Sequence, residues 1–405
     1  MTIYPVVGDK NDLLKEVYKI GCDEKAISIL SKKFNVLPIK VTDLKPSRAN
    51  IIKQEMLSSK GDVVVNSKSI SCTIDKTDAL LLGTEANYQD FIRKMEFQNS
   101  PYLIELSKQI KKIIENYYNR LPSQMTRNNK VIDYSRPNIM GILNVTKDSF
   151  YDGGKYTNLD KAIVHCEEMI KDGVDIIDIG AESTRPGATP VPAEEEIERV
   201  IPILEKIKKE FDIVISVDTY KSIVAEEALK AGADIINDIS GFSFDENMID
   251  VVKRYNAITV IMHIQGKPQN MQINPVYSDV VRELIEYFDE KIYFASTKGY
   301  NINNLIIDPG IGFGKKLSHN IEIIKNIPAF KKYGLPVMIG VSRKSMIGMI
   351  MGNTDSMNEK VVPVEDRLYG TLGLNAMAIM KGVDIIRVHD VKAHAHLIKI
   401  IQAMK

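Results

Sequence analysis

The six residues GVDIID at 173–178 recur as GADIIN at 232–237 and as GVDIIR at 382–387, and NLIID at 304–308 is a partial copy. The glycine suits the end of a preceding helix, and the aspartate and two isoleucines begin a buried strand. Each copy then ends in a polar side chain, which costs free energy inside an apolar strand unless it is satisfied. The four polar residues are Asp178, Asn237, Asp308 and Arg387. Their equivalent positions indicate a shared purpose.

The repeat belongs to a longer alternation of short apolar runs with helical patterns. The expected strands cover 138–145, 175–182, 213–219, 234–240, 258–264, 304–310, 336–342 and 384–390. Such nearly continuous apolar runs are typical of parallel strands that are covered on both faces. Helical spacing lies between them, for example at Ile163, Cys166 and Ile170. Eight such units predict a TIM (β/α)8 barrel of the α/β class, and a doubly wound open sheet is the main alternative.

The barrel accounts for only part of the 405 residues, which suggest two or three domains. The stretch LPSQMTRNNKVIDYSRP at 121–137 is polar and contains two prolines, so the chain changes character there. We expect a small α/β domain at 1–130, a linker at 131–137 and the barrel at 138–405.

The first domain carries none of the motifs of the barrel. Strands are predicted at 62–66 and 79–84, and a long helix is predicted at 101–119. Our hypothesis for this domain is an assembly or stability module.

Composition excludes several classes of protein. Lys and Arg together number 53, as do Asp and Glu, so the net charge of zero gives no general attraction to nucleic acid or to an anionic membrane. The three cysteines are far apart, which argues against a disulfide framework or a cysteine zinc site. No signal peptide and no run of 18 apolar residues is visible. We therefore expect a cytoplasmic protein.

Polar residues cluster at the predicted strand ends, which meet at one mouth in a barrel. Carboxylates and an amide can pair with the donors of a flat heterocycle; these are Asp218, Asn237 and Asp308. Cationic groups and a second amide suit an anion with a metal; these are Arg185, Arg387, His389 and Asn144. Lys344 is able to bridge the two groups. No phosphate-binding loop of the GxxxxGK[ST] type and no GxGxxG dinucleotide fingerprint is present.

From about residue 135 onward the chain resembles the dihydropteroate synthase family. The matching segments are IMGILNVTKDSFYDGG (139–154), DIGAESTRPGATPVPAEEE (178–196), VDTYK (217–221), INDISG (236–241), MHIQGKPQNMQ (262–272), DPGIGFGK (308–315), GVSRKSMIG (340–348) and RVHD (387–390). That family condenses 6-hydroxymethyl-7,8-dihydropterin diphosphate with 4-aminobenzoate, which yields 7,8-dihydropteroate and diphosphate in folate biosynthesis. The resemblance implies the same reaction here.

The resemblance also implies roles for residues at the strand ends. Asn144 is expected to be a ligand of Mg2+, which also keeps waters and binds the diphosphate. Asp308, Asn237 and Asp218 are expected to bond the pterin ring, with Met262 packed on it. Lys344 is expected to bond the pterin and to face the reacting methylene. We expect Asp218, Lys344 and Asp308 to be the catalytic residues.

The remaining residues are expected to bind the diphosphate and the 4-aminobenzoate. Arg387 and His389 are expected to hold the diphosphate, with help from Ser183 and Arg185. The aminobenzoate subsite is expected to be formed by Thr184, Pro186, Phe313 and Ser342. From the family we expect a dissociative displacement, which needs no covalent protein nucleophile. Substrate loops are expected at 146–157 and 183–192, and Lys147 stands where the family usually has proline.

Several interpretations remain open at this point. A pterin-dependent methyltransferase shares the barrel and the pterin pocket but needs no diphosphate site, and a pterin-binding protein without catalysis is a further alternative. Asp178 is interpreted as structural, and His263 as a residue of the pocket wall. Arg343 is expected either to pair with a surface carboxylate or to contact substrate. The family resemblance suggests a homodimer formed through barrel helices.

Overall fold

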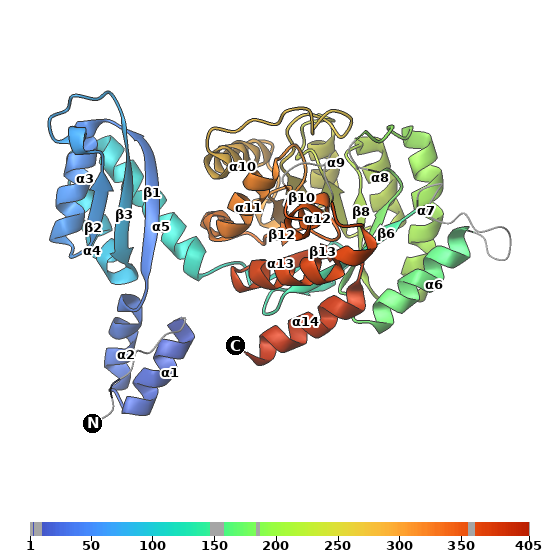
Figure 1. Cartoon of the computed structure of the whole chain (residues 1–405), viewed down its shortest axis with the longest axis horizontal. Coiled ribbons are helices and arrows are strands. Elements are labelled where there is room, and N and C mark those ends of the chain that lie inside the picture. Colours follow the sequence, from blue (N-terminus) through green and yellow to red (C-terminus); the bar gives the residue numbers. More distant parts are fainter. Residues whose placement is uncertain (1–2, 4–9, 146–157, 184–186, 355–360, 405) are drawn as a thin grey trace. The chain divides into compact units, whose positions relative to one another are not determined.

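The computed structural model describes residue 3 and residues 10–145, 158–183, 187–354 and 361–404. The chain divides into two compact units, Met1–Tyr118 and Asn119–Lys405 (Figure 1).

The N-terminal unit is a three-stranded antiparallel sheet with helices on one face. Its elements are α1 (Lys10–Ile20), α2 (Glu24–Leu30), β1 (Val36–Leu44), α3 (Pro46–Ser58), β2 (Asp62–Val65), β3 (Thr77–Thr84), α4 (Glu85–Glu96) and α5 (Pro101–Tyr118). The strand order is β1-β3-β2. Strand β3 alternates between buried and more exposed residues, and its buried Ala79 and Leu81 join a core that includes Phe91 of α4 and Ile110 of α5. The strands and the long helix predicted from the sequence are therefore present as β2, β3 and α5.

The second unit is the predicted barrel. Its strands are β6 (Asn138–Asn144), β7 (Ile176–Gly180), β8 (Val214–Asp218), β9 (Ile235–Asp238), β10 (Ile258–Met262), β11 (Leu305–Asp308), β12 (Met338–Ile339) and β13 (Ile385–Val388). All neighbours pair in parallel in the order β11-β10-β9-β8-β7-β6-β13-β12. A parallel bridge between Ile307 and Val337 links the two ends of that order, so the sheet closes and the open-sheet alternative is excluded.

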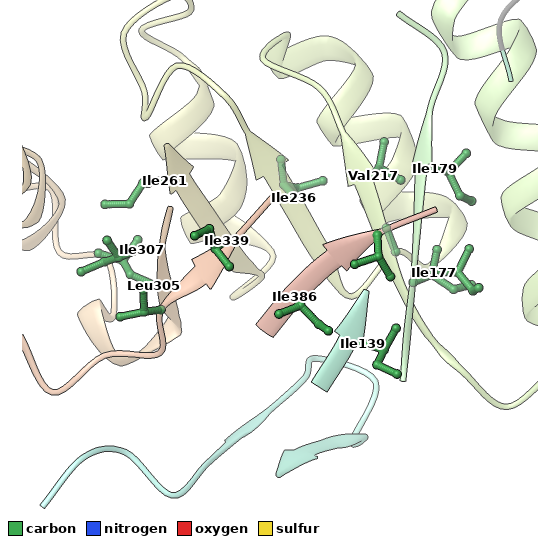
Figure 2. Close-up of a cluster of buried hydrophobic side chains, with 14 of the residues drawn as sticks. Ile139, Ile177, Ile179, Val217, Ile236, Ile261, Leu305, Ile307, Ile339 and Ile386 are labelled. Atoms are coloured by element: carbon green, nitrogen blue, oxygen red, sulfur yellow. The ribbon is translucent and has the colours of Figure 1, made fainter. Parts of the chain in front are cut away.

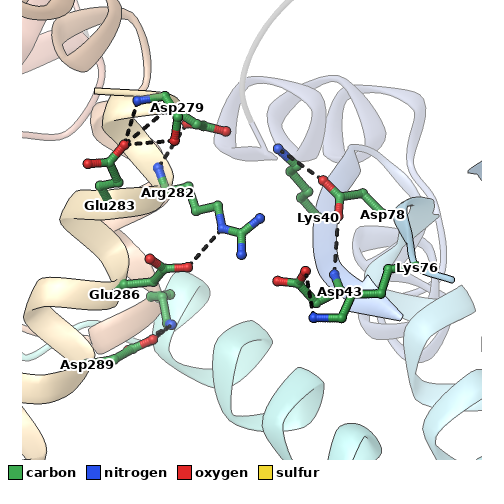
Figure 3. Close-up of polar contacts among 11 residues, drawn as sticks. Lys40, Asp43, Lys76, Asp78, Asp279, Arg282, Glu283, Glu286 and Asp289 are labelled. Carbon is green, nitrogen blue, oxygen red and sulfur yellow. Dashed lines mark hydrogen bonds and ion pairs between the residues drawn. The ribbon is translucent and has the colours of Figure 1, made fainter. Parts of the chain in front are cut away.

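Helices surround the strands in chain order. They are α6 (Asn158–Lys171), α7 (Ala193–Glu210), α8 (Ser222–Ala231), α9 (Met248–Arg254), α10 (Val280–Thr297), α11 (Leu317–Lys325), α12 (Ser345–Met351), α13 (Leu368–Met380) and α14 (Val391–Ala403). None of the described helices is long and apolar enough to cross a membrane. At the start of α10 the Asp279 carboxylate accepts from Arg282 N at 3.0 Å, and Arg282 Nε donates to Glu286 at 2.8 Å (Figure 3). A capped first turn and a pair four residues apart both favour this helix.

The strands are apolar on both faces because each face meets a separate core. One cluster fills the interior of the barrel and includes Ile176, Val260 and Ile306. The other lies between the strands and the helices; it includes the neighbouring Ile177, Ile261 and Ile307, which Figure 2 labels. Successive side chains of a strand point to opposite faces, so the continuous apolar runs seen in the sequence serve two cores.

The stretch that was expected to be a linker instead covers the end of the barrel at which the strands begin. We call residues 119–137 the floor of the barrel. Residues 119–137 belong to the second unit and contain the antiparallel strands β4 (Ser123–Met125) and β5 (Val131–Asp133). Ile132 is buried in the interior core of the barrel. The boundary between the units therefore falls after Tyr118. Asn129, with φ of 61°, lies in the turn of this hairpin, and turn residues of this kind resemble a linker in the sequence.

The leading aspartate of each full repeat fastens this floor. Each one accepts a bond from a side chain of residues 119–137 and another from a backbone N–H. The side-chain donors are Arg136 for Asp175 (3.0 Å), Asn128 for Asp234 (2.8 Å) and Arg120 for Asp384 (2.8 Å). The backbone donors are Ile139 (2.8 Å), Ile215 (3.1 Å) and Val337 (2.9 Å), in the same order. The aspartate at the third position of the repeat is therefore structural.

Candidate active site

The last position of the repeat lies at the opposite end of the barrel. Arg387 on β13 is the centre of a buried polar cluster there. Its Nε donates to Asp178 at 2.6 Å, and its Nη2 donates to Asp218 at 2.8 Å. Asn237 Nδ2 donates to the same oxygen of Asp178 at 3.1 Å. Four strands, β7, β8, β9 and β13, thus bring together the groups that the sequence placed at separate strand ends.

Asp178 was expected to be structural, but it lies inside this cluster. It is fully buried, and within the described part of the chain its Oδ1 has no hydrogen-bond partner. A buried carboxylate oxygen without a donor is costly, and its position beside Arg387 and Asn237 makes it a candidate site residue. The repeat carried the signal, because Asp178 occupies the same position as Asn237 and Arg387.

The two predicted pterin carboxylates are nearly buried. Burial raises the pKa of Asp218 to about 7, although the Arg387 guanidinium opposes that rise and the nearby Asp178 adds to it. Burial also raises the pKa of Asp308, which Lys344 opposes. Asp308 accepts one backbone bond, from Gly310 N at 2.8 Å. Burial therefore favours the neutral form of both carboxyl groups until partners that carry N–H donors stabilise the charged form.

Lys344 lies where the loop after β11 meets the loop after β12. Its Nζ donates to the carbonyl oxygen of Ile311 and lies 4.4 Å from the centre of the Phe313 ring. Burial lowers the pKa of Lys344 to about 8, while Asp308 counteracts this and Arg387 adds to it. A Cβ on Gly312 would approach Lys344 Cδ to 3.1 Å. The glycine therefore permits the close approach of the loop to this lysine.

The loop ends after β12 and β13 are joined by a pair of predicted site residues. Ser342 Oγ lies 2.9 Å from His389 Nδ1 and accepts from His389 N at 3.2 Å. Next to them, Arg343 donates through Nε and Nη2 to both oxygens of Asp390, at 2.9 and 2.7 Å. Of the two expectations for Arg343, the structure thus supports pairing with a carboxylate.

Asn144 ends β6 and faces the same cluster. A Cβ on Gly180 would lie 3.7 Å from Asp218 Oδ2 and 3.9 Å from Asn144 Oδ1, so both oxygens border the backbone of Gly180. Among the described residues, no group of three or more His, Cys, Asp or Glu side chains could hold a metal ion. One amide oxygen nevertheless fits Mg2+, since this ion keeps several waters and is often held through substrate phosphates.

Three of the predicted residues lie outside the described ones, namely Thr184, Arg185 and Pro186, as does the expected loop 146–157 with Lys147. Ser183 is described and is half-buried after β7. Met262 is buried at the end of β10, and Phe313 is half-buried.

A cluster of three charged residues that follow strands of the barrel was not anticipated from the sequence. Lys221 Nζ lies 2.5 Å from Glu182 and 2.6 Å from the buried Glu196. Glu182 also accepts from Val191 N at 3.0 Å, and this bond links residue 182 to residue 191. Glu182 follows β7, Lys221 lies between β8 and α8, and Glu196 is in the first turn of α7. This placement between strands and helices is the one signal in the sequence that could have indicated them.

Comparisons with known proteins point to one family. Residues 140–389 match the family model described as pterin binding enzyme. Among curated relatives, the dihydropteroate synthase of Bacillus subtilis is 46% identical over 66% of this chain and 88% of its own length. That of Escherichia coli K12 is 43% identical over 67% of this chain and 93% of its own length.

Solved structures give the same result. The dihydropteroate synthase of Yersinia pestis, solved as a sulfonamide drug complex, covers 70% of this chain and 98% of its own, with 39% identity and a TM-score of 0.64. That of Xanthomonas albilineans with 4-aminobenzoic acid has the same coverage and TM-score at 37% identity. The family match lies wholly within the barrel.

Proposed function

This chain belongs to the dihydropteroate synthase family of pterin-binding transferases, which act in folate biosynthesis, and we propose that it catalyses a Mg2+-dependent condensation. The substrates are 6-hydroxymethyl-7,8-dihydropterin diphosphate and 4-aminobenzoate, and the products are 7,8-dihydropteroate and diphosphate. We place this reaction in the cytoplasm. The observation that carries the proposal is the cluster of Asp178, Asp218, Asn237 and Arg387 at the barrel mouth.

The pterin lies against the acidic part of the mouth. Its amino-pyrimidinone edge presents parallel N–H donors, which match an ionised carboxylate such as Asp308 together with the amide of Asn237. Asp218 accepts from the other ring donors. Met262, buried at the end of β10, packs on the ring. This arrangement directs the methylene that bears the diphosphate toward Lys344.

The diphosphate lies against the cationic part. Arg387 and His389, with Ser183 and Arg185, stabilise the charge that develops as this group leaves. Arg387 already bonds Asp178 and Asp218, so its position is fixed before substrate arrives. Asn144 would hold Mg2+ together with the diphosphate, where the bound ion would neutralise charge on the leaving group.

The reaction itself is a displacement at carbon. The C–O bond to diphosphate breaks, and the electron pair leaves with the diphosphate. The carboxylates of Asp218 and Asp308 stabilise the positive charge on the pterin methylene. The arylamine nitrogen then forms the new C–N bond and releases one proton. Thr184, Pro186, Phe313 and Ser342 hold this second substrate near Lys344.

The test uses the full-length protein with both substrates. Diphosphate release that requires 4-aminobenzoate and stops when Mg2+ is chelated is the expected result. Binding of the pterin without such release would contradict the synthase proposal and would favour a non-catalytic pterin-binding protein. Transfer of a methyl group from a methylated tetrahydrofolate, with no arylamine-dependent release, would instead indicate the methyltransferase class.

We infer in addition that the active form is a homodimer formed through α13. This helix buries Ala378 and Ile379 against the barrel, yet its outward side carries the exposed Tyr369, Met377 and Met380. A helix that is apolar on all sides is usually covered on all sides. Light scattering should therefore give twice the 45.5 kDa of one chain, and Met377→Glu should give a monomer. A monomeric wild-type protein would contradict the inference.

A further inference from the structure

Lys315 directly follows the glycine-rich loop 309–314 and is almost completely buried, with 3% of its surface exposed. Four acceptor atoms surround its Nζ. They are His263 Nδ1 at 2.9 Å, Gly310 O at 2.9 Å, Phe313 O at 3.0 Å and His263 O at 3.2 Å. No role in the reaction described above uses this lysine, and the sequence had left His263 as a residue of the pocket wall.

The chemistry of this cage favours an ammonium ion. Gly310 O also accepts from Phe313 N at 3.1 Å, so the three other acceptor atoms are the ones that need Lys315. An ammonium group has three N–H donors to match them. A neutral amine has two and would leave one of these buried acceptors without a donor, which is costly. Burial lowers the pKa of Lys315 well below its usual range; the nearby Asp308 opposes this, and the charge of Lys344 adds to it. Burial and the charge of Lys315 also lower the pKa of His263 to about 2. The imidazole is therefore neutral and turns an unprotonated Nδ1 toward Lys315.

The loop that Lys315 anchors is conformationally demanding. Gly310, Gly312 and Gly314 have φ values of 69°, 82° and 62°, a region that residues with a Cβ rarely adopt. A Cβ on Gly310 would lie 1.9 Å from His263 O, and one on Gly314 would lie 2.5 Å from Gln265 O. The loop after β11 thus lies directly on the chain that follows β10. A segment with three glycines loses much conformational entropy on ordering, so it needs a fixed anchor.

This anchored loop holds the residues proposed to act on substrate. Ile311 O accepts from Lys344 Nζ, and the Phe313 ring lies 4.4 Å from the same nitrogen. Lys315 bonds the carbonyl groups of Gly310 and Phe313, on either side of Ile311. We propose that Lys315 is a positioning residue, whose buried Nζ fixes the loop 309–314 so that Phe313 and Lys344 form the arylamine subsite. This inference rests on the proposed function.

The kinetic test compares Lys315→Met with Lys316→Met. The second is the same change at the next residue, which is exposed. In Lys315→Met, kcat/KM for 4-aminobenzoate should fall about 100-fold, because small displacements of positioned groups have effects of this order. Binding of the dihydropterin diphosphate should change less than about fivefold, since three of its proposed partners, Asp218, Asn237 and Arg387, lie on β8, β9 and β13, outside the loop. Lys316→Met should match the wild type. Full activity of Lys315→Met, or equal losses for both substrates, would overturn the proposal.

A second measurement needs no variant of Lys315 and remains informative if Lys315→Met does not fold. The protein has six histidines, so imidazole NMR signals are resolvable, and His263→Gln assigns the relevant one. Between about pH 5 and 9 the His263 signal should stay constant, with Nδ1 unprotonated. Tyr277 and Tyr287 also face this ring, but burial raises the pKa of both phenols above this range. A titrating His263, or a protonated Nδ1, would contradict the cage. If the wild type lacks synthase activity, this measurement still tests the cage separately.

Discussion

The floor and the mouth of the barrel are built from the two ends of the same repeat, yet they treat polar groups differently. At the floor, Asp175, Asp234 and Asp384 each accept from a side chain and from a backbone N–H. At the mouth, Asp178 and Asn237 share donors and acceptors around Arg387. One oxygen of Asp178 has no partner among the described residues.

This difference separates stability from function. Satisfied buried carboxylates hold elements together, whereas groups with incomplete partners and shifted pKa values are typical of sites that receive a ligand. Burial raises the pKa of Asp218 and lowers that of Lys344 at the mouth. A change at the mouth should therefore alter turnover more than stability, and a change at the floor should do the reverse.

The largest expected effect is that of Lys344→Ala. We expect kcat to fall about 10²–10³-fold, because a charge aimed at the reacting group is lost. The melting temperature should not fall, since the mutation removes a half-buried ammonium rather than a core contact. Steady-state kinetics and calorimetry measure both quantities, with Lys316→Ala as the control. Full turnover in the variant would show that the role of this lysine was misassigned.

The pH dependence gives the next effect. The pKa of Asp218 is raised to about 7 and that of Lys344 is lowered to about 8. Below pH 7 Asp218 is protonated and accepts poorly from the pterin, so kcat/KM should fall about tenfold per pH unit there and should decline again above pH 8.

Since the folded state binds more protons at Asp218 than the unfolded state does, this group's contribution to stability falls as pH rises from about 4 to 7.

Profiles of kcat/KM against pH for the wild type provide the measurement. The free pterin substrate must be titrated separately so that its own ionisation is subtracted. A flat profile between pH 5 and 7 would mean that the mouth does not hold Asp218 in the state inferred here.

At the floor, Asp384→Asn should act on stability alone. Its carboxylate accepts from Arg120 and from Val337 N, so the change leaves a partly buried guanidinium without its charge partner. We expect a loss of about 1–3 kcal/mol in the free energy of unfolding, with unchanged kcat. The control is Asp212→Asn, because Asp212 pairs with Lys130 but is 95% exposed; its effect should stay below about 0.5 kcal/mol. A fall in kcat for Asp384→Asn would remove the distinction between the two ends.

The smallest effect on turnover is expected from removing residues 1–118. The cut leaves Arg120, Asn128 and Arg136 on the floor, so kcat per barrel should change less than about twofold, whereas assembly mass or melting temperature should change. Removing residues 1–137 instead takes away all three floor contacts and should destabilise the barrel. Lost turnover with unchanged mass after the shorter deletion would favour a direct contribution of the first unit to the site.

Much of the fold and of the candidate site could be predicted from the sequence, because a repeated pattern of apolar strands is compatible with few folds. It predicted the eight strands and the convergence of Asp218, Asn237 and Arg387. The interpretation of Asp178 as structural stays a prediction, although the structure places this residue in the cluster at the mouth. Nothing in GVDIID alone tells which neighbours a buried aspartate meets. That depends on Arg387, which is distant in sequence and adjacent only after the barrel closes.

The floor and the cage were missed for related physical reasons. A polar hairpin with prolines and asparagines resembles a linker until its Ile132 is seen inside the barrel. Lys315 resembles any lysine shortly before a helix, because its partners are mostly backbone carbonyl groups, which every sequence contains. The placement of Arg343 beside Asp390 was one of two expectations, and only the folded loops distinguish them.

The spacing of the repeat has a practical meaning for anyone who wishes to engineer this barrel. Asp175 lies directly before β7 and Asp178 lies within it, so the two are three residues, or about 10 Å, apart along the chain, with two isoleucines between them. Thermal tolerance could thus be improved by redesigning contacts on one side of that apolar layer, while substrate preference is altered on the other. A laboratory evolution experiment could select the two traits in parallel, since the mutations that serve each would seldom compete for the same atoms.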